Sequence, residues 1–191
     1  MPRYAEEDPY TYPNSSVLIN IPGYRSQEEL NAFERRITLA KMLSEPPPGN
    51  FDYEHLKSIH KHLFEDIYEW AGQERNVPII KGDSQFATPA FIHQQAILLF
   101  KELHEERFFQ YLPENEFARK AAHFVLELNV IHPFRDGNGR ALRLFLLLLA
   151  ENAGYTLKPK NLEKSWLDAC TKGFLGTSLQ WSNCFNVQSH P

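Results

Sequence analysis

Apolar residues recur every three or four positions along much of the chain, which is the spacing of one face of a helix. Capping residues, prolines and glycines set the boundaries of these stripes. They predict helices that begin near Ser26, Asp52, Thr88, Glu114 and Gly139. The first helix should end before the prolines at 46–48 and the second at Gly72. A further helix is expected after Asn161, with the aromatic tail around Trp181 covering the core.

Other segments depart from this pattern. The leucines of the helix near Gly139 occupy every face, so we expect it to be the buried central helix. Two β-prone runs flank residues 81–84 and predict a β-hairpin, in which Pro78 indicates a free strand edge. Residues 1–25 carry prolines among tyrosines and favour an extended arm. The sequence predicts a mainly α domain at 26–191, with a hairpin at about 75–88.

Composition narrows the class of protein. The chain has 191 residues, 42% of them hydrophobic, which suffices for one domain with a substantial core. A net charge of -4 supplies no basic field, so we expect no direct contact with nucleic acid. Cys170 and Cys184 have no metal-binding spacing and suit a reducing cytoplasm. The apolar run at 144–150 is well short of the ~20 residues that span a bilayer, so no membrane association is expected.

The stretch HPFRDGNGR, residues 132–140, interrupts the helical pattern. Pro133 and the glycines make a regular helix costly, so the chain should turn here. Asp136, Gly137, Asn138 and Gly139 then lead into a helix start, where several backbone N–H groups lack partners. Those N–H groups and the helix dipole predict an anion site.

The surrounding side chains sharpen that prediction. Arg140 and Arg143 lie three positions apart in the first turn, where cations oppose the helix dipole unless a polyanion is bound. Arginine suits phosphate oxygens, and a triphosphate would use both arginines. Asp136 is a candidate ligand for Mg²⁺ beside those phosphates, and His132 is a candidate general base. Together these residues indicate nucleophilic attack on phosphorus.

Simpler interpretations apply to some of the same residues. Phe134 is expected to anchor the motif in the core, and Asn138 either holds the tight turn together or contacts the ligand. His55, His60, His62, His93 and His104 are expected mainly on solvated helix faces. The motif lacks the third glycine of a dinucleotide fingerprint, and no GK[ST] is present for a P-loop.

The segment HPFRDGNGRALR, residues 132–143, fits the Fic signature HxFx[DE]GNGRxxR at every fixed position. The stretch IHKHLFEDIYEWAGQ, residues 59–73, resembles the segment that precedes the flap hairpin in that family. The chain therefore resembles a Fic-domain protein adenylyltransferase. The resemblance implies a helical bundle around a buried central helix, with the β-hairpin as a flap over the active site.

The family's reaction is transfer of AMP from ATP to a hydroxyl side chain of a target protein, with release of pyrophosphate. By resemblance, His132 would deprotonate the hydroxyl and Asp136 would hold Mg²⁺. Phosphates would be bound by the head of the following helix, at Gly137, Asn138, Gly139, Arg140 and Arg143. The target would dock on the flap by strand addition, at Ile79, Ile80, Lys81 and Phe86.

Many Fic proteins are inhibited by a glutamate in an [ST]xxxE[GN] motif, which pairs with the second motif arginine. No glutamate of this chain has Ser or Thr four residues before it. The chain thus resembles the class in which a small separate antitoxin supplies the glutamate, here to Arg143. The short chain is similar to bacterial Fic toxins, some of which modify DNA gyrase and topoisomerase IV.

Alternative interpretations stay open. Related proteins of this fold transfer phosphate or phosphocholine, and a non-enzymatic anion-binding module would use the same loop. If the chain belongs to a longer secreted effector, host GTPases would be its targets and the host cytosol its compartment. The sequence does not fix the target, the adenine contacts or the oligomeric state.

Overall fold

The computed structural model describes residues 8–81, 84–157 and 188–189. The helices in these residues are α1 (Gln27–Leu43), α2 (Tyr53–Phe64), α3 (Pro89–Glu105), η1 (Arg107–Phe109), α4 (Glu114–Ile131) and α5 (Asn138–Asn152). The short strands are β1 (Ile80–Lys81), β2 (Ser84–Gln85), β3 (Tyr155–Thr156) and β4 (Gln188–Ser189). The expectations for Asn161 and Trp181 lie outside the described residues.

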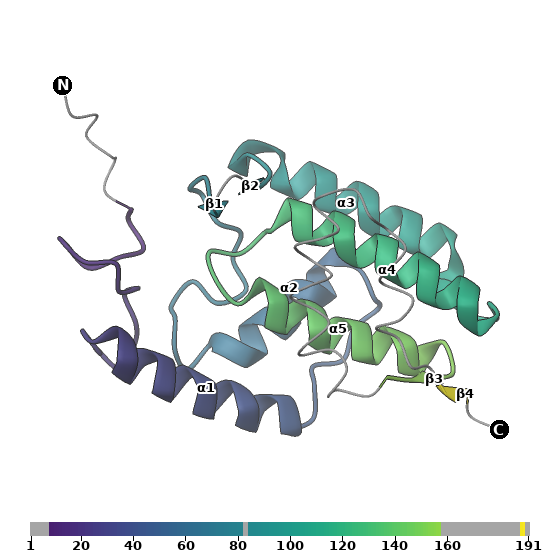
Figure 1. The fold of residues 1–191 in the computed structure, drawn as a ribbon, viewed down its shortest axis with the longest axis horizontal. Coiled ribbons are helices and arrows are strands. Elements are labelled where there is room, and N and C mark those ends of the chain that lie inside the picture. The colour runs from purple at the N-terminus through teal and green to yellow at the C-terminus, as the bar shows by residue number, and fades with distance from the viewer. Residues whose placement is uncertain (1–7, 82–83, 158–187, 190–191) are drawn as a thin grey trace.

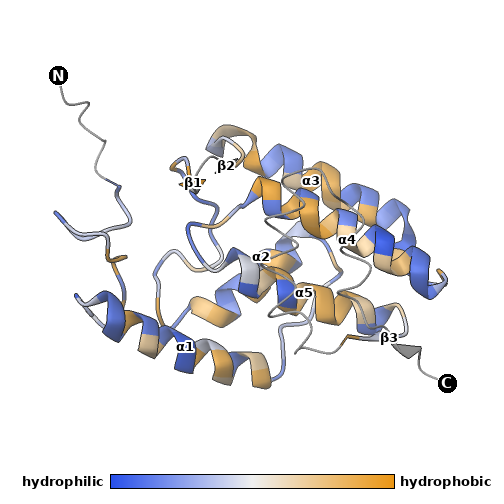
Figure 2. Cartoon of the chain, in the orientation of Figure 1, coloured by the Kyte–Doolittle hydropathy of each residue, from blue (hydrophilic) through white to orange (hydrophobic). Residues whose placement is uncertain are grey.

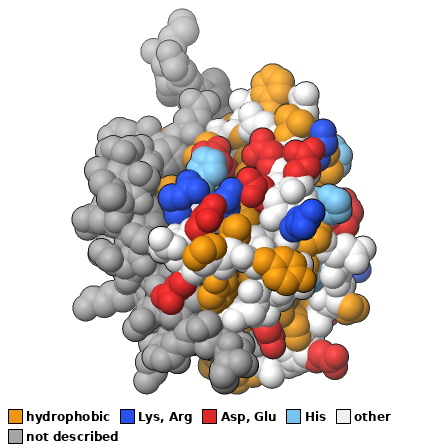
Figure 3. Space-filling view, turned by 90° about the vertical axis from the view of Figure 1, so that its right-hand side faces the viewer, with side chains coloured by type: hydrophobic (Ala, Val, Ile, Leu, Met, Phe, Trp, Pro, Cys, Tyr) orange, Lys and Arg blue, Asp and Glu red, His pale blue; other side chains and the backbone are white. Residues whose placement is uncertain are grey.

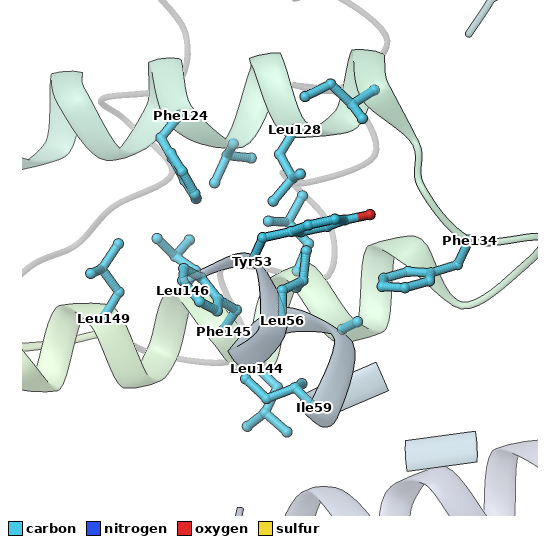
Figure 4. Packing of buried hydrophobic residues seen from close by; sticks show 14 of the residues in the cluster. Tyr53, Leu56, Ile59, Phe124, Leu128, Phe134, Leu144, Phe145, Leu146 and Leu149 are labelled. Carbon is cyan, nitrogen blue, oxygen red and sulfur yellow. The ribbon is translucent and has the colours of Figure 1, made fainter. Parts of the chain in front are cut away.

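Helix α5 lies at the centre of the fold and contacts both α2 and α4 (Figure 1). Leu146, Leu149 and Phe145 are fully buried, and hydrophobic residues cover most of the helix (Figure 2). Side chains of α2 and α4 pack onto it, among them Leu56 and Phe124 (Figure 4). The prediction of a buried central helix is confirmed, because a helix that is apolar on every face must be covered on every face.

The caps expected from the sequence start two of the helices. The Ser26 hydroxyl accepts from the Glu29 N–H at 3.5 Å, and the Asp52 carboxylate accepts from the His55 N–H at 2.8 Å. Thr88 precedes Pro89 at the start of α3 as expected, although its side chain makes no capping hydrogen bond. Proline in the first turn sets the backbone angle of the helix by itself.

The second helix is shorter than predicted. Helix α2 ends at Phe64, and the chain reaches Gly72 through turns. The Phe64 carbonyl accepts from both Ile67 and Tyr68, while the Ile67 carbonyl accepts from the Ile21 N–H at 2.8 Å. The segment before α1 therefore takes a carbonyl that a longer helix would use, and this tertiary contact outweighs the apolar periodicity.

The hairpin is present where the sequence predicts it. Ile80 pairs with Gln85 and Lys81 with Ser84, in antiparallel register. Its base is joined to the helices, since the Ala87 N–H donates to the Val130 carbonyl at 3.1 Å. This bond holds the flap beside the C-terminal end of α4, where the motif begins.

Candidate active site

His132 lies at the point where α4 ends. Its backbone is left-handed, with φ 50° and ψ 63°, which is an uncommon conformation for a residue with a side chain. Its N–H donates to the Leu128 carbonyl, and its own carbonyl accepts from the Arg75 Nε at 2.8 Å. The ring stacks on Phe86 of the flap, with centroids 3.9 Å apart. The histidine is therefore held both through its backbone and through its ring.

The surroundings of His132 select one tautomer. Its Nδ1 lies 3.3 Å from the Asn129 carbonyl, which can only accept a hydrogen bond. Nδ1 therefore carries the hydrogen, and Nε2 carries the lone pair in the neutral ring. A lone pair on a histidine ring is what a general base requires.

The turn after His132 is closed by Asn138. Its side-chain oxygen accepts from the Phe134 N–H at 2.9 Å, and its side-chain nitrogen donates to the Phe134 carbonyl at 2.7 Å. Phe134 is buried in the core, as the sequence predicts. Of the two interpretations left open for the Asn138 side chain, the structure supports the one in which it holds the turn.

Gly137 has a positive φ of 78° and precedes α5 as its N-cap. A Cβ at this position would lie 2.4 Å from the Phe64 ring and 3.1 Å from the His60 Nε2. Only glycine fits both the backbone angle and the space. The amides of Asn138 and Gly139 follow as the first two of the helix, where helix geometry gives them no partner inside the helix.

His60 was expected on a solvated face, and that expectation is wrong. The side chain is fully buried, as is most of His55 on the same helix. Burial lowers the pKa of His60 to about 4, so the ring is neutral at neutral pH. Its Nε2 lies 2.9 Å from the Asp136 carbonyl, directly beneath the motif.

Arg140 makes an ion pair with Glu34 of α1, with 2.6 Å between Nη2 and Oε1. The Tyr68 hydroxyl donates to the other oxygen of this carboxylate. Burial raises the pKa of Tyr68 well above its usual value, so the phenol stays protonated and remains a donor. The guanidinium also lies over the Phe64 ring, 4.7 Å from its centroid. Helix α1 thus fixes the first motif arginine.

Arg140 and Arg143 line one groove between α1 and the start of α5. The groove has a volume of about 520 Å³, and Glu34, Arg35 and Met42 are among its lining residues. Both arginines therefore face one space, as their spacing predicts.

The Asp136 carboxylate is about half exposed and accepts from the Gly137 N–H at 2.5 Å. In the described part of the chain, no three His, Cys, Asp or Glu side chains gather into a metal site. A single exposed carboxylate fits Mg²⁺ when the remaining ligands are substrate oxygens and water. Asp136 is thus chemically suited to the predicted role.

The flap residues differ in their exposure to solvent. Ile80 is 66% exposed, whereas Ile79 is buried and Phe86 is buried against His132. Ile80 and Lys81 form β1 of the flap. Ile80 is therefore available to a docking segment, while Phe86 supports the histidine ring.

Arg75 connects the flap to the motif. Its buried guanidinium donates to the carbonyls of Val77 and Ala87 at the flap base, and to those of Ile131 and His132. Its N–H also donates to the Pro133 carbonyl at 2.8 Å. These carbonyls include the C-terminal end of α4, where a cation is stabilised by the helix dipole.

A second hollow of about 320 Å³ lies between the C-terminal end of α3 and the middle of α4. Two of the residues that line it, Glu106 and Lys120, form an ion pair of 2.7 Å. Figure 3 shows acidic and basic side chains lying among one another on one face of the molecule. The hollow contains none of the motif residues, so it is separate from the candidate active site.

Comparison with known proteins identifies the family. The model of the Fic/DOC family matches residues 50–150. The chain belongs to the Fic/DOC family. It is 41% identical to the probable protein adenylyltransferase y4lH of Sinorhizobium fredii, over 92% of this chain and 93% of that protein. It is 37% identical to the probable protein adenylyltransferase Fic of Escherichia coli, over 91% of this chain and 88% of that protein.

The protein adenylyltransferase VbhT of Bartonella schoenbuchensis is 38% identical over 90% of this chain, which spans only 37% of VbhT. Among solved structures, Bartonella tribocorum BepC with bound AMPPNP has a TM-score of 0.86 and 28% identity, and covers 95% of this chain and 97% of BepC. These comparisons confirm the predicted Fic fold and the predicted enzyme class. None of the helices in the described ranges is long and apolar enough to cross a membrane.

The sequence prediction missed several residues that shape the site. Glu34, Tyr68 and Arg75 contact the motif or the flap from outside it, and no local motif marks them. The burial of His60 could have been predicted from the sequence, because this residue lies on the same apolar stripe as Leu56, Ile59 and Leu63. A histidine on such a stripe is buried, and a buried histidine needs partners for its ring nitrogens.

Replacing Arg75 by methionine should lower the free energy of unfolding by about 3 kcal/mol or more, because buried carbonyls lose their donor. Arg135→Met is the matched control, since Arg135 pairs with Asp8 near the surface at 2.5 Å. Such an ion pair contributes about 1 kcal/mol or less to the free energy of unfolding. Urea unfolding of both variants measures the difference, and equal losses would show that Arg75 is not a structural clamp.

Proposed function

We propose that this chain transfers AMP from ATP to a hydroxyl side chain of a target protein and releases pyrophosphate. One observation carries the proposal: a single short loop joins His132, whose Nδ1 faces the Asn129 carbonyl, to the glycine N-cap at the start of α5. Relatives named protein adenylyltransferases and neighbours crystallised with AMPPNP or ADP support the same reaction.

The start of α5 binds the triphosphate. The amides of Asn138 and Gly139 and the positive end of the helix dipole face phosphate oxygens, and Gly137 permits their close approach. Arg140 and Arg143, in the same groove, bind the β and γ phosphates. Asp136 would hold Mg²⁺, which neutralises charge on the phosphates when bound.

His132 acts as the general base. Its Nε2 takes the proton of the target hydroxyl as that oxygen attacks the α-phosphorus. A new phosphorus–oxygen bond forms while the bond to the pyrophosphate oxygen breaks, and pyrophosphate leaves. Stacking on Phe86 and the bond to the Asn129 carbonyl keep the ring oriented throughout.

The flap brings the target to His132. The target segment pairs with the hairpin backbone as an added strand along residues 79–81 and contacts the exposed side chain of Ile80, while the buried Phe86 supports the His132 ring. The high exposure of Ile80 supports this role. The bonds from Arg75 to the flap base keep this docking edge at a fixed distance from the histidine.

We further propose that the protein is a toxin of the bacterial cytoplasm and that a small antitoxin supplies an inhibitory glutamate to Arg143. The absence of any glutamate with the inhibitory spacing supports this regulation. The groove that exposes Arg143 beside α1 has room for such a side chain. DNA gyrase and topoisomerase IV are the first targets to test.

Replacing His132 by alanine should reduce target modification by about 10²- to 10⁴-fold with little change in ATP affinity, because only the proton acceptor is lost. The measurement uses bacterial lysate, Mg²⁺ and ATP labelled at the α or the γ phosphate. Label should reach protein only from the α position.

Transfer from the γ position would instead establish a phosphotransferase, and label from neither would leave a phosphocholine transferase or a binding module. If His132→Ala labels the target protein as fully as the wild-type chain does, His132 is not the general base.

Replacing Arg143 by alanine should weaken ATP binding about tenfold or more and leave AMP binding nearly unchanged, because only the terminal phosphates contact this residue. Arg35→Ala is the control, since Arg35 lines the same groove from exposed positions of α1. Titration calorimetry with both nucleotides gives the answer, and equal weakening of ATP and AMP would refute the assignment.

A further inference from the structure

His60 is a buried histidine that the proposed chemistry does not use. Its ring is 0% exposed and stacks on Phe134, with centroids 3.9 Å apart. Phe64 packs beside it, with centroids 4.7 Å apart. A ring enclosed in this way has no access to a substrate, so its function must be exerted through its neighbours.

Two backbone groups fix the state of the ring. The Gly72 N–H donates to Nδ1 at 2.9 Å, which requires Nδ1 to carry a lone pair. The Asp136 carbonyl lies 2.9 Å from Nε2 and can only accept, so Nε2 carries the hydrogen. His60 therefore joins the turn after α2 to the loop before α5 as a neutral, single tautomer.

The bond to Asp136 fixes the peptide that opens the anion site. In a trans peptide the carbonyl and the following N–H point in opposite directions. Holding the Asp136 carbonyl against His60 therefore turns the Gly137 N–H to the other side of the loop, where it donates to the Asp136 carboxylate, the candidate Mg²⁺ ligand. His60 and Phe64 also form the floor beneath Gly137, and Arg140 lies over the same Phe64 ring.

We propose that His60 is a positioning residue, which orients the phosphate-binding loop through the Nε2–H bond to the Asp136 carbonyl. The nature of the ligand rests on the function proposed above, whereas the orientation of the loop does not. The bond to Gly72 serves to hold the ring in place, so the two nitrogens have separable effects.

Two substitutions separate them. In His60→Gln the amide nitrogen reaches the position of Nε2 and keeps a donor for Asp136. In His60→Asn the amide oxygen reaches the position of Nδ1, which keeps the Gly72 bond and removes the donor. Both variants lose the aromatic ring, and each loses one of the two hydrogen bonds: His60→Gln loses the bond from Gly72 and His60→Asn loses the bond to Asp136. A change in the loop that occurs only in His60→Asn is therefore due to the lost donor.

His55 provides the matched control. It is also buried on α2, with Nδ1 accepting from the Phe51 N–H and Nε2 beside the Pro47 carbonyl. These partners lie in the turn before α2, away from the motif. His55→Asn should therefore destabilise the protein without changing the loop.

The experiment measures hydrogen exchange of residues 134–139 in the nucleotide-free protein, and the affinity for AMPPNP with Mg²⁺ by calorimetry. His60→Asn should speed loop exchange and weaken AMPPNP about tenfold, the effect of one lost hydrogen bond. His60→Gln should keep wild-type exchange and bind within about threefold, and His55→Asn should match wild type in both measurements.

Equal behaviour of the two His60 variants, in exchange and in affinity, would overturn the proposal. Another outcome is that the two His60 variants differ in hydrogen exchange of the loop while the wild-type chain binds no AMPPNP. In that case the positioning role stands and the proposed function fails.

A measurement on the wild-type chain covers the case in which a variant does not fold. A long-range ¹H–¹⁵N spectrum of the histidines, assigned through the contact with Phe134, reports which ring nitrogen of His60 carries hydrogen. Hydrogen on Nε2 supports the bond to Asp136, and hydrogen on Nδ1 excludes it.

Discussion

The active loop depends on hydrogen bonds that its own backbone cannot make. Between α4 and α5 the chain leaves regular structure inside the protein, where an unpaired carbonyl is costly. The Arg75 guanidinium donates to the carbonyls of Ile131 and His132. The Asn138 side chain donates to the Phe134 carbonyl, and the His60 ring donates to the Asp136 carbonyl. Buried donors from α2, the flap base and α5 therefore determine the path of the loop.

This arrangement suits phosphoryl chemistry. Little covalent work is required of the protein in such reactions, so catalysis consists mainly of positioning and electrostatic stabilisation. A left-handed histidine and a glycine N-cap can be kept ready only if the surrounding structure holds them. The flap base and the loop share Arg75, so the surface proposed to dock the target and His132, the proposed proton acceptor, are held by the same side chain.

The helices and the turn that starts α5 could be predicted because both leave local signals: periodicity in α4 and α5, and glycines at a helix start. The end of α2 could not, because the Ile67 carbonyl is taken by Ile21 from far along the chain. Arg75 follows Gly72 in an irregular segment without periodicity, so its burial follows only from the fold. Glu34 reaches Arg140 from the buried face of α1, one turn after Leu30, and the identity of its partner has no signature in the sequence.

If the loop is already shaped for a triphosphate before one binds, a crystal structure of this chain with AMPPNP and Mg²⁺ should show phosphates at the start of α5 between Arg140 and Arg143. The hydrogen bonds from Arg75, Asn138 and His60 should be unchanged, and the α-phosphorus should face the Nε2 side of His132. Phosphates bound elsewhere, or a loop that exchanges these hydrogen bonds for others on binding, would show that the loop is not shaped in advance.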